Sequence, residues 1–136
     1  MRIVVDSWAW IELFKASSAG RSAKQSIEEA DDVFTPAIVL AELARKYVRE
    51  GEDIVAIRRW LSSVTESTQV VEIDTKLAEE SAKASLELTR KAKEERLTKP
   101  GLGDAIILAT ARVWQAQVLT GDSHFRGLPE TLWIAD

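Results

Sequence analysis

The fold is decided by residues 1–15, MRIVVDSWAWIELFK. Within them, the apolar run Ile3–Val5 suits a short buried strand, and the segment Ser7–Phe14 carries apolar side chains at helical spacing. Alternation of short apolar runs with longer helical segments is typical of a parallel sheet flanked by helices. Asp6 stands between the two, so we expect it to lie at the carboxyl end of the first strand.

The same alternation continues along the chain. Further strands are predicted at Val33–Thr35, Val70–Ile73, Val118–Thr120 and Leu132–Ile134. Further helices are predicted at Ser22–Ala30, Ala37–Glu50, Ile54–Glu66, Thr75–Glu95 and Asp104–Gln115. The sequence therefore predicts one α/β domain over residues 1–136, a three-layer α/β/α sandwich around a mostly parallel sheet of about five strands.

The composition excludes several kinds of site. The chain has 136 residues, one His, no Cys, and 18 Lys plus Arg against 22 Asp plus Glu, a net charge of −4. Without Cys there is no disulfide, thiolate zinc site, iron–sulfur cluster or thiol nucleophile, which favours a reducing compartment. With a single His, a metal site must be built from oxygen ligands, which suit Mg²⁺ or Mn²⁺.

We expect a soluble, cytoplasmic protein. Asp6 interrupts what would be the apolar stretch of a signal peptide, and no apolar run approaches the roughly 20 residues that cross a bilayer. The net charge also lacks the basic character of proteins that bind nucleic acid by charge alone. A phosphodiester ligand would need positive charge from another source.

Four acidic residues are expected at one edge of the sheet, because parallel strands end, and their crossover helices begin, at the same edge. Asp6 ends the first strand, and Asp122 follows the fourth. Glu42 lies early in the helix after the second strand, and Asp104 opens the helix before the fourth. We expect all four to face one crevice.

Each of these acids also has an ordinary local explanation. Asp6 and Asp104 could cap helices, and Asp122 could be a turn residue. Glu42 could form helix-surface ion pairs with Arg45 and Lys46, three and four residues further on. Asp74 also follows a predicted strand and is interpreted as the N-cap of the long helix.

Together, four motifs resemble the PIN-domain ribonucleases, and most of all the VapC-type toxins of prokaryotic toxin–antitoxin pairs. They are the first strand with Asp6 and Ser7, PAIVLAE at 36–42, GDAIILATA at 103–111 and LTGDSHF at 119–125. The resemblance covers the whole chain in order. It implies a metal-dependent endoribonuclease that leaves a 5′-phosphate, a homodimer, and a small antitoxin that covers the crevice.

The resemblance also assigns roles to residues. Asp6, Glu42, Asp104 and Asp122 match the family's metal-binding acids, and Ser7 and Thr120 match small hydroxyl residues that support the site. The family often has another acid two residues after the position of Asp122. Here that residue is His124, which leaves open a role at the metal, a contact with substrate, or no role.

Divalent metal chemistry explains how an acidic protein could cleave RNA. Bound Mg²⁺ or Mn²⁺ would relieve repulsion among the carboxylates, acidify a water and attract the phosphate. We expect Asp6 and Asp104 to be direct or nearly direct ligands, with Asp122 and Glu42 completing the pocket. Candidate RNA contacts are Arg45, Lys46 and Arg49, which share a helix face with Glu42, together with Lys99 and His124.

Other functional classes were weighed against this one. A phosphoacceptor receiver module could use Asp74, but it would need an acidic pair at the end of the first strand and a Lys near Asp122, and neither is present. A Ser-His-Asp hydrolase would need a Gly-x-Ser-x-Gly elbow, which is absent. A PIN-like scaffold without activity remains the main alternative, although retention of all four acids argues against it.

Overall fold

The computed structural model describes residues 1–136, in which helices and strands alternate as the sequence predicts. The strands are β1 (Arg2–Val5), β2 (Asp32–Pro36), β3 (Gln69–Val71), β4 (Gln117–Thr120) and β5 (Thr131–Trp133). The α-helices are α1 (Ser7–Lys15), α2 (Ser18–Glu29), α3 (Ala37–Arg49), α4 (Ile54–Ser67), α5 (Thr75–Glu95) and α6 (Leu102–Val113). A 3-10 turn, η1 (Ser123–Phe125), follows β4.

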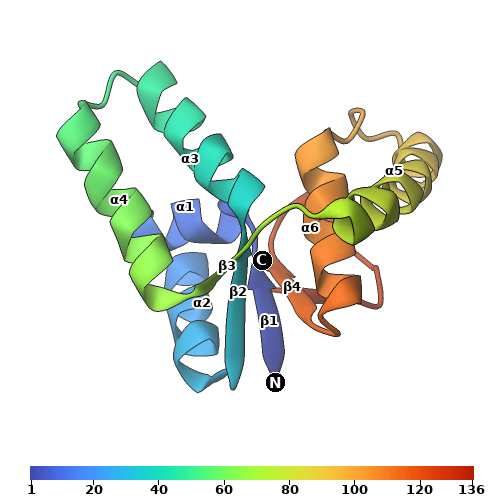
Figure 1. Cartoon of the computed structure of the whole chain (residues 1–136), viewed down its shortest axis with the longest axis horizontal. Helices are drawn as coiled ribbons and strands as arrows, with labels where there is room; N and C mark the ends of the chain where they lie inside the picture. The colour runs from blue at the N-terminus through green and yellow to red at the C-terminus, as the bar shows by residue number, and fades with distance from the viewer.

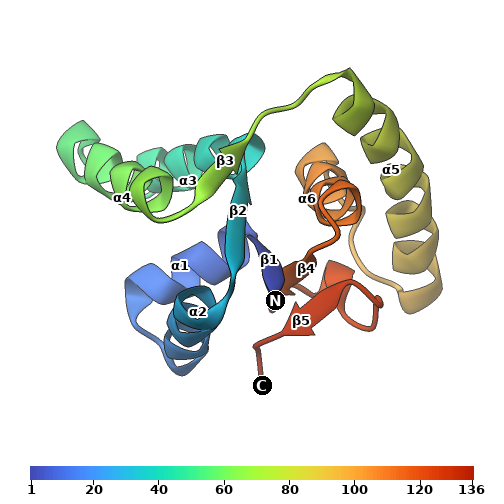
Figure 2. The same ribbon diagram turned by 60° about the horizontal axis from the view of Figure 1, so that its bottom comes forward.

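The five strands form one sheet in the order β3-β2-β1-β4-β5, and every pairing is parallel. Helices α1 to α4 cover one face, and α5 and α6 cover the other (Figures 1 and 2). This confirms the predicted α/β class and its three layers. The chain adds β2 and β3 on one side of β1 and then β4 and β5 on the other side, so the direction in which strands are added changes at β1. Such folds form their crevice at the carboxyl ends of the strands around this point, which here are β1, β2 and β4.

The core lies on both faces of the two central strands. In β1, Ile3, Val4 and Val5 are fully buried, as are Val118 and Leu119 in β4. Helix α6 packs across these strands and is buried from Ala105 to Ala111. Continuous apolar sequence is what a strand or helix covered on all sides requires, which is why these elements were recognisable from sequence.

Several predicted boundaries were wrong by a few residues, for identifiable reasons. Helix α2 begins at Ser18 and not at Ser22, because Ser17 caps it by accepting the N–H of Gly20 at 3.0 Å. Helix α6 begins at Leu102, so Asp104 lies inside its first turn and does not open it. Strands β3 and β5 end at Val71 and Trp133, earlier than predicted. The η1 turn was not predicted.

No helix has both the length and the apolar character that crossing a membrane would require.

The contact between α1 and α2 depends on a glycine. A Cβ at Gly20 would lie 2.0 Å from the carbonyl oxygen of Glu12 and 2.9 Å from the Cα of Leu13. Both are backbone atoms, so the two helices could accept a methyl group only by moving apart.

Gly20→Ala should therefore lower the free energy of unfolding by about 2 kcal/mol, in the range typical of overpacked cores and in spite of alanine's better helix propensity. Urea denaturation measures this. Ser22→Ala, on the exposed side of the same helix, is the matched control and should leave stability almost unchanged. Equal stability of both variants and the wild type would contradict the close packing.

Candidate active site

Asp6 is the buried centre of the candidate site. It follows β1 directly, and its side chain is almost fully buried, at 2% exposure. One carboxylate oxygen accepts the N–H of Ala9 at 2.9 Å and so caps α1, while the other accepts the hydroxyl of Thr120. The parallel register pairs Val5 with Leu119, which places Thr120 at the end of β4 beside Asp6. Asp6 is thus both a helix cap and part of a contact between strand ends.

Thr120 connects Asp6 to Asp122. The Thr120 hydroxyl oxygen accepts the N–H of Asp122 at 2.9 Å while it donates to Asp6. The side chain of Asp122 then accepts the N–H of His124 at 2.9 Å, which closes the η1 turn. The expected turn role of Asp122 is therefore present, and the same geometry keeps its carboxylate close to that of Asp6.

Glu42 reaches the site from α3. Its Oε1 accepts the hydroxyl of Ser7 at 2.8 Å, so the two elements that follow β1 and β2 are joined at this edge. The alternative of helix-surface ion pairs is not found: Lys46 pairs with Glu50, and Arg45 makes no ion pair. Glu42 is instead turned toward the first turn of α6, where a Cβ on Gly103 would lie 2.5 Å from its Oε2.

Asp104 lies in the first turn of α6. Its Oδ2 accepts the N–H of Gly101 at 3.0 Å, which satisfies a free donor at the start of the helix. The helix-capping role expected for Asp104 is therefore present. Because α6 begins at the same edge at which β1 and β4 end, the capping carboxylate also faces the other acids.

The electrostatics show that the four acids share one environment. Burial is the main reason that the pKa of Asp6 rises from 3.8 to about 7, and the charges of Asp122 and Asp104 raise it further against the hydrogen bonds from Thr120 and Ala9. Burial likewise raises the pKa of Glu42, with contributions from Asp104 and Asp122. It also raises the pKa of Asp104, with Asp122 adding to the effect. The predicted acids therefore come together and repel one another.

The donors suit a hard divalent cation. All four groups are carboxylates, the ligands that Mg²⁺ and Mn²⁺ prefer, and their mutual repulsion is what such an ion would relieve. No group of three or more acidic or histidine side chains is arranged so that it could hold a metal ion directly. Mg²⁺ commonly binds one or two carboxylates and keeps several waters, so it is the chemistry of the donors that suits the ion, without a preformed cage of ligands.

The candidate RNA contacts differ in their surroundings. Arg45 lines a hollow of about 340 Å³ together with Glu42, Leu102 and Gly103. Lys46 is held by Glu50, while Arg49 is exposed one turn beyond Arg45. Lys99 lines a separate hollow of about 290 Å³ with Lys93. Of the predicted basic residues, Arg45 thus lies beside a site acid without forming an ion pair, although its charge acts to lower the pKa of Glu42, which burial raises.

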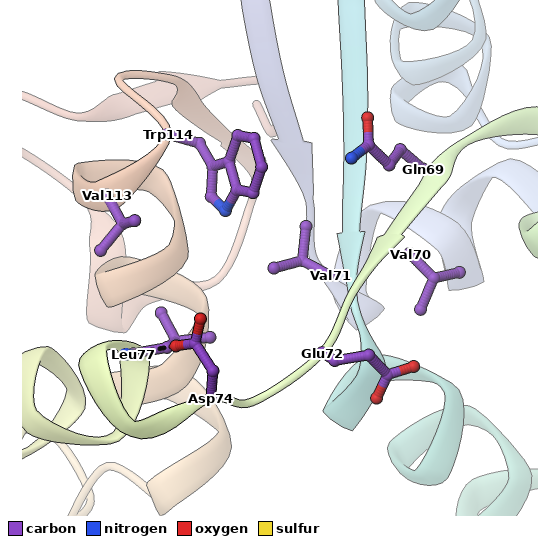
Figure 3. A pocket seen from close by; sticks show the side chains of 8 residues that line it. All are labelled: Gln69, Val70, Val71, Glu72, Asp74, Leu77, Val113 and Trp114. Carbon is purple, nitrogen blue, oxygen red and sulfur yellow. Dashed lines mark hydrogen bonds between the residues drawn. The ribbon is translucent and has the colours of Figure 1, made fainter.

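Asp74 lies in a different part of the molecule. Figure 3 shows it at the amino end of α5, in a hollow that Glu72 and Trp114 also line. Its carboxylate accepts the N–H of Leu77 at 2.8 Å, which confirms the interpretation as an N-cap. The charges that raise the pKa values of Asp6, Glu42 and Asp104 do not include Asp74.

Sequence reasoning did not predict the contacts that the loop between α5 and α6 makes with the site. His124 lies 2.8 Å from Asp122 through Nδ1 and 2.8 Å from the carbonyl oxygen of Thr98 through Nε2. Partial burial lowers the pKa of His124, but these two contacts and the charges of Asp122 and Asp104 outweigh it and raise that pKa overall. The run PGLG at 100–103 marked a break in the chain, but not that Gly101 and Gly103 contact site acids.

Comparison with models of known protein families identifies the family of this chain. The family model of the PIN domain matches residues 3–130, nearly the whole chain. The chain belongs to the PIN-domain family. No curated protein matches it by sequence.

Solved structures of PIN proteins share its fold. A toxin–antitoxin complex from Klebsiella pneumoniae aligns over 98% of both chains, with a TM-score of 0.68 and 24% identity. VapC20 from Mycobacterium tuberculosis, described as a toxin that cleaves the sarcin–ricin loop, has a TM-score of 0.70 and 20% identity over 95% of this chain and 96% of its own. VapBC-1 from nontypeable Haemophilus influenzae has a TM-score of 0.70 and 18% identity, over 98% and 96%.

Burying Asp6 should cost the metal-free protein stability at neutral pH. Its folded pKa lies above its ordinary value, so folding favours the protonated form, and stability should fall as the pH rises from about 4 to 7 and stay low above that. Asp6→Asn removes the buried charge and should be more stable than the wild type at about pH 8 by roughly 1 to 3 kcal/mol, with the difference shrinking toward about pH 4.

Urea denaturation in the presence of a chelator, repeated across this pH range, measures the difference. Asp53→Asn is the matched control, because Asp53 caps α4 in the same way but is exposed. If Asp53→Asn raised the free energy of unfolding as much as Asp6→Asn, or if Asp6→Asn did not raise it, the loss of stability assigned to the burial of Asp6 would be contradicted.

Proposed function

We propose that the chain is a metal-dependent endoribonuclease that hydrolyses RNA phosphodiester bonds, and that it is the toxin of a VapBC-type toxin–antitoxin pair. The observation that carries the proposal is the meeting of Asp6, Glu42, Asp104 and Asp122 at one sheet edge, with the pKa of the buried Asp6 raised to about 7. Membership of the PIN family supports the reaction class. Carboxylates that raise one another's pKa are typical of functional sites.

Each acid has a role in this proposal. A bound Mg²⁺ or Mn²⁺ would supply the positive charge that draws the phosphate to an acidic pocket and would acidify a water. Asp6 and Asp104, fixed by Thr120 and Gly101, would hold the cation directly or nearly so. Glu42 and Asp122 would complete the pocket, where they could orient a water or help to hold a second ion.

The surrounding side chains hold the acids and the substrate. Ser7 fixes the carboxylate of Glu42, and Thr120 fixes that of Asp6, so neither must reorganise during the reaction. Arg45, in the hollow beside Glu42, contacts an RNA phosphate, with Arg49, Lys46 and Lys99 further along the backbone. These basic residues and the cation would supply the local positive charge in a protein whose net charge is −4.

The proposed partners rest on analogy with the structures that the chain resembles. One is a toxin–antitoxin complex, one is a VapBC assembly, and one is a toxin described as cleaving the sarcin–ricin loop. By analogy, we propose an RNA substrate, a cognate antitoxin, a homodimer and a cytoplasmic location for this chain.

Cleavage of a panel of labelled RNAs tests the reaction. With Mg²⁺ or Mn²⁺ the wild type should cleave at least one RNA, and a chelator should abolish cleavage. Asp6→Asn and Asp104→Asn should each lower the rate by about a hundredfold or more, since each removes a ligand charge from the site. Asp74→Asn, the matched control, changes the N-cap of α5 outside the site and should cleave at the wild-type rate.

Cleavage that persists in both site variants or in chelator would show the mechanism to be wrong. Binding of Mn²⁺ without cleavage of any RNA would instead favour a PIN-like scaffold.

Gly103 gives a test that keeps all four acids. Gly103→Ala would place a methyl group 2.5 Å from Oε2 of Glu42 and should displace that flexible side chain from Ser7. We expect the cleavage rate to fall about tenfold or more, as when a supporting contact of a metal site is lost. Gly101→Ala is the control, because a Cβ there has no neighbour closer than 4.0 Å. Equal activity of both variants and the wild type would show that the position of Glu42 is unimportant.

A further inference from the structure

His124 bridges two separate parts of the candidate site. Its Nδ1 lies 2.8 Å from Oδ1 of Asp122, and its Nε2 lies 2.8 Å from the carbonyl oxygen of Thr98. A carboxylate and a carbonyl only accept hydrogen bonds, so a ring bonded to both carries a proton on each nitrogen and a positive charge. Nε2 also lies 3.3 Å from the hydroxyl of Thr98. With 17% of its side chain exposed, the ring is held between its partners and does not extend into solvent.

The two partners belong to segments far apart in the sequence. Asp122 follows β4, whereas Thr98 lies in the loop between α5 and α6, 26 residues before His124. That loop continues into Gly101, whose N–H binds the carboxylate of Asp104. One short loop therefore contacts Asp104 directly and Asp122 through His124.

The two hydrogen bonds of His124 bear on its role, for which the sequence leaves open a place at the metal, a contact with substrate, or none. Where related chains often carry a further acid, His124 offers no oxygen ligand, and both of its nitrogens are already engaged. Direct contact with RNA would require the ring to give up one of these bonds. Asp122 has 31% of its side chain exposed and, apart from its own turn, has this ring as its support.

We propose that His124 is a positioning residue, which ties Asp122 to the loop that holds Asp104 and so keeps the two carboxylates at a fixed separation. The role rests on the proposed nuclease function, because the separation matters only if the carboxylates share a cation. Outer contacts that orient the ligands of a metal ion typically change metal affinity or activity by about tenfold to a hundredfold when they are removed.

Three variants separate the two ends of the bridge. His124→Ala removes both bonds. In His124→Asn the amide nitrogen takes a place near that of Nδ1 and keeps the bond to Asp122, while in His124→Gln it takes a place near that of Nε2 and keeps the bond to Thr98. Ser123→Ala is the matched control, because Ser123 is the exposed neighbour in the same turn and its hydroxyl makes no hydrogen bond.

We expect His124→Ala to weaken Mn²⁺ binding, measured by electron paramagnetic resonance titration without RNA, by about tenfold or more. Its kcat should fall to a similar degree while its KM for RNA stays within about twofold of the wild type. The Asn and Gln variants should lie between alanine and wild type. Hydrogen exchange at residues 97–101 should become faster in His124→Ala and in His124→Asn, and Ser123→Ala should match the wild type throughout.

Some results would overturn the inference and leave the nuclease function intact. One is wild-type Mn²⁺ affinity, kcat and loop exchange in His124→Ala. Another is a raised KM with unchanged Mn²⁺ affinity and kcat, which would make His124 an RNA contact. A wild type that neither binds Mn²⁺ nor cleaves RNA would overturn the proposed function and the positioning role together.

Discussion

The structure depends on a carboxylate buried at the point where the central strands end. Asp6 is held by the N–H of Ala9 and by the hydroxyl of Thr120, and these two bonds join the start of α1 to the end of β4. Removing a charged group from water is unfavourable unless it is protonated, paired or bound to a cation. A raised pKa for Asp6 is the direct consequence. The strand order places three more acids around a group that is already difficult to ionise.

The unfavourable free energy of burying a charged carboxylate among other acids explains why the same residues serve both the structure and the proposed function. Every site acid also has a structural role: Asp6 and Asp104 satisfy donors at helix starts, Asp122 closes a turn, and Glu42 joins α3 to α1 by accepting the hydroxyl of Ser7. These bonds hold the carboxylates in place although they repel one another. Proteins often keep such unfavourable arrangements where activity needs them, at the expense of stability. A divalent cation is the partner that would turn the repulsion into binding.

The sequence predicted most of the fold, because buried strands and helices follow from strong local patterns, and it predicted that four acids would lie at one sheet edge. Continuous apolar runs at Ile3–Val5 and Val118–Thr120 identified buried strands, and parallel topology then placed Asp6 and Asp122 at one edge. The register that sets Thr120 beside Asp6 follows from the same strands. These inferences needed only the positions of the strand ends.

What the sequence did not predict depends on contacts between distant side chains. Glu42 and Glu50 are each four residues from Lys46, so the sequence does not decide which of them forms an ion pair with it. In the structure the partner is Glu50. The close approach of Gly103 to Glu42 and the bridge from His124 to Thr98 span 61 and 26 residues, so only the packed fold creates them. The start of α2 was missed because the Ser17 cap comes directly before Ser-Ala-Gly, which resembles a loop.

The measurement that tests the central claim most directly is a carbon-13 NMR titration of the Asp6 carboxyl group, with and without Mg²⁺. In metal-free protein, Asp6 should titrate near pH 7, and saturating Mg²⁺ should lower its pKa by several units, since a bound cation favours the charged form. Titration near the ordinary value of 3.8 without metal, or a pKa that Mg²⁺ leaves unchanged, would contradict the account.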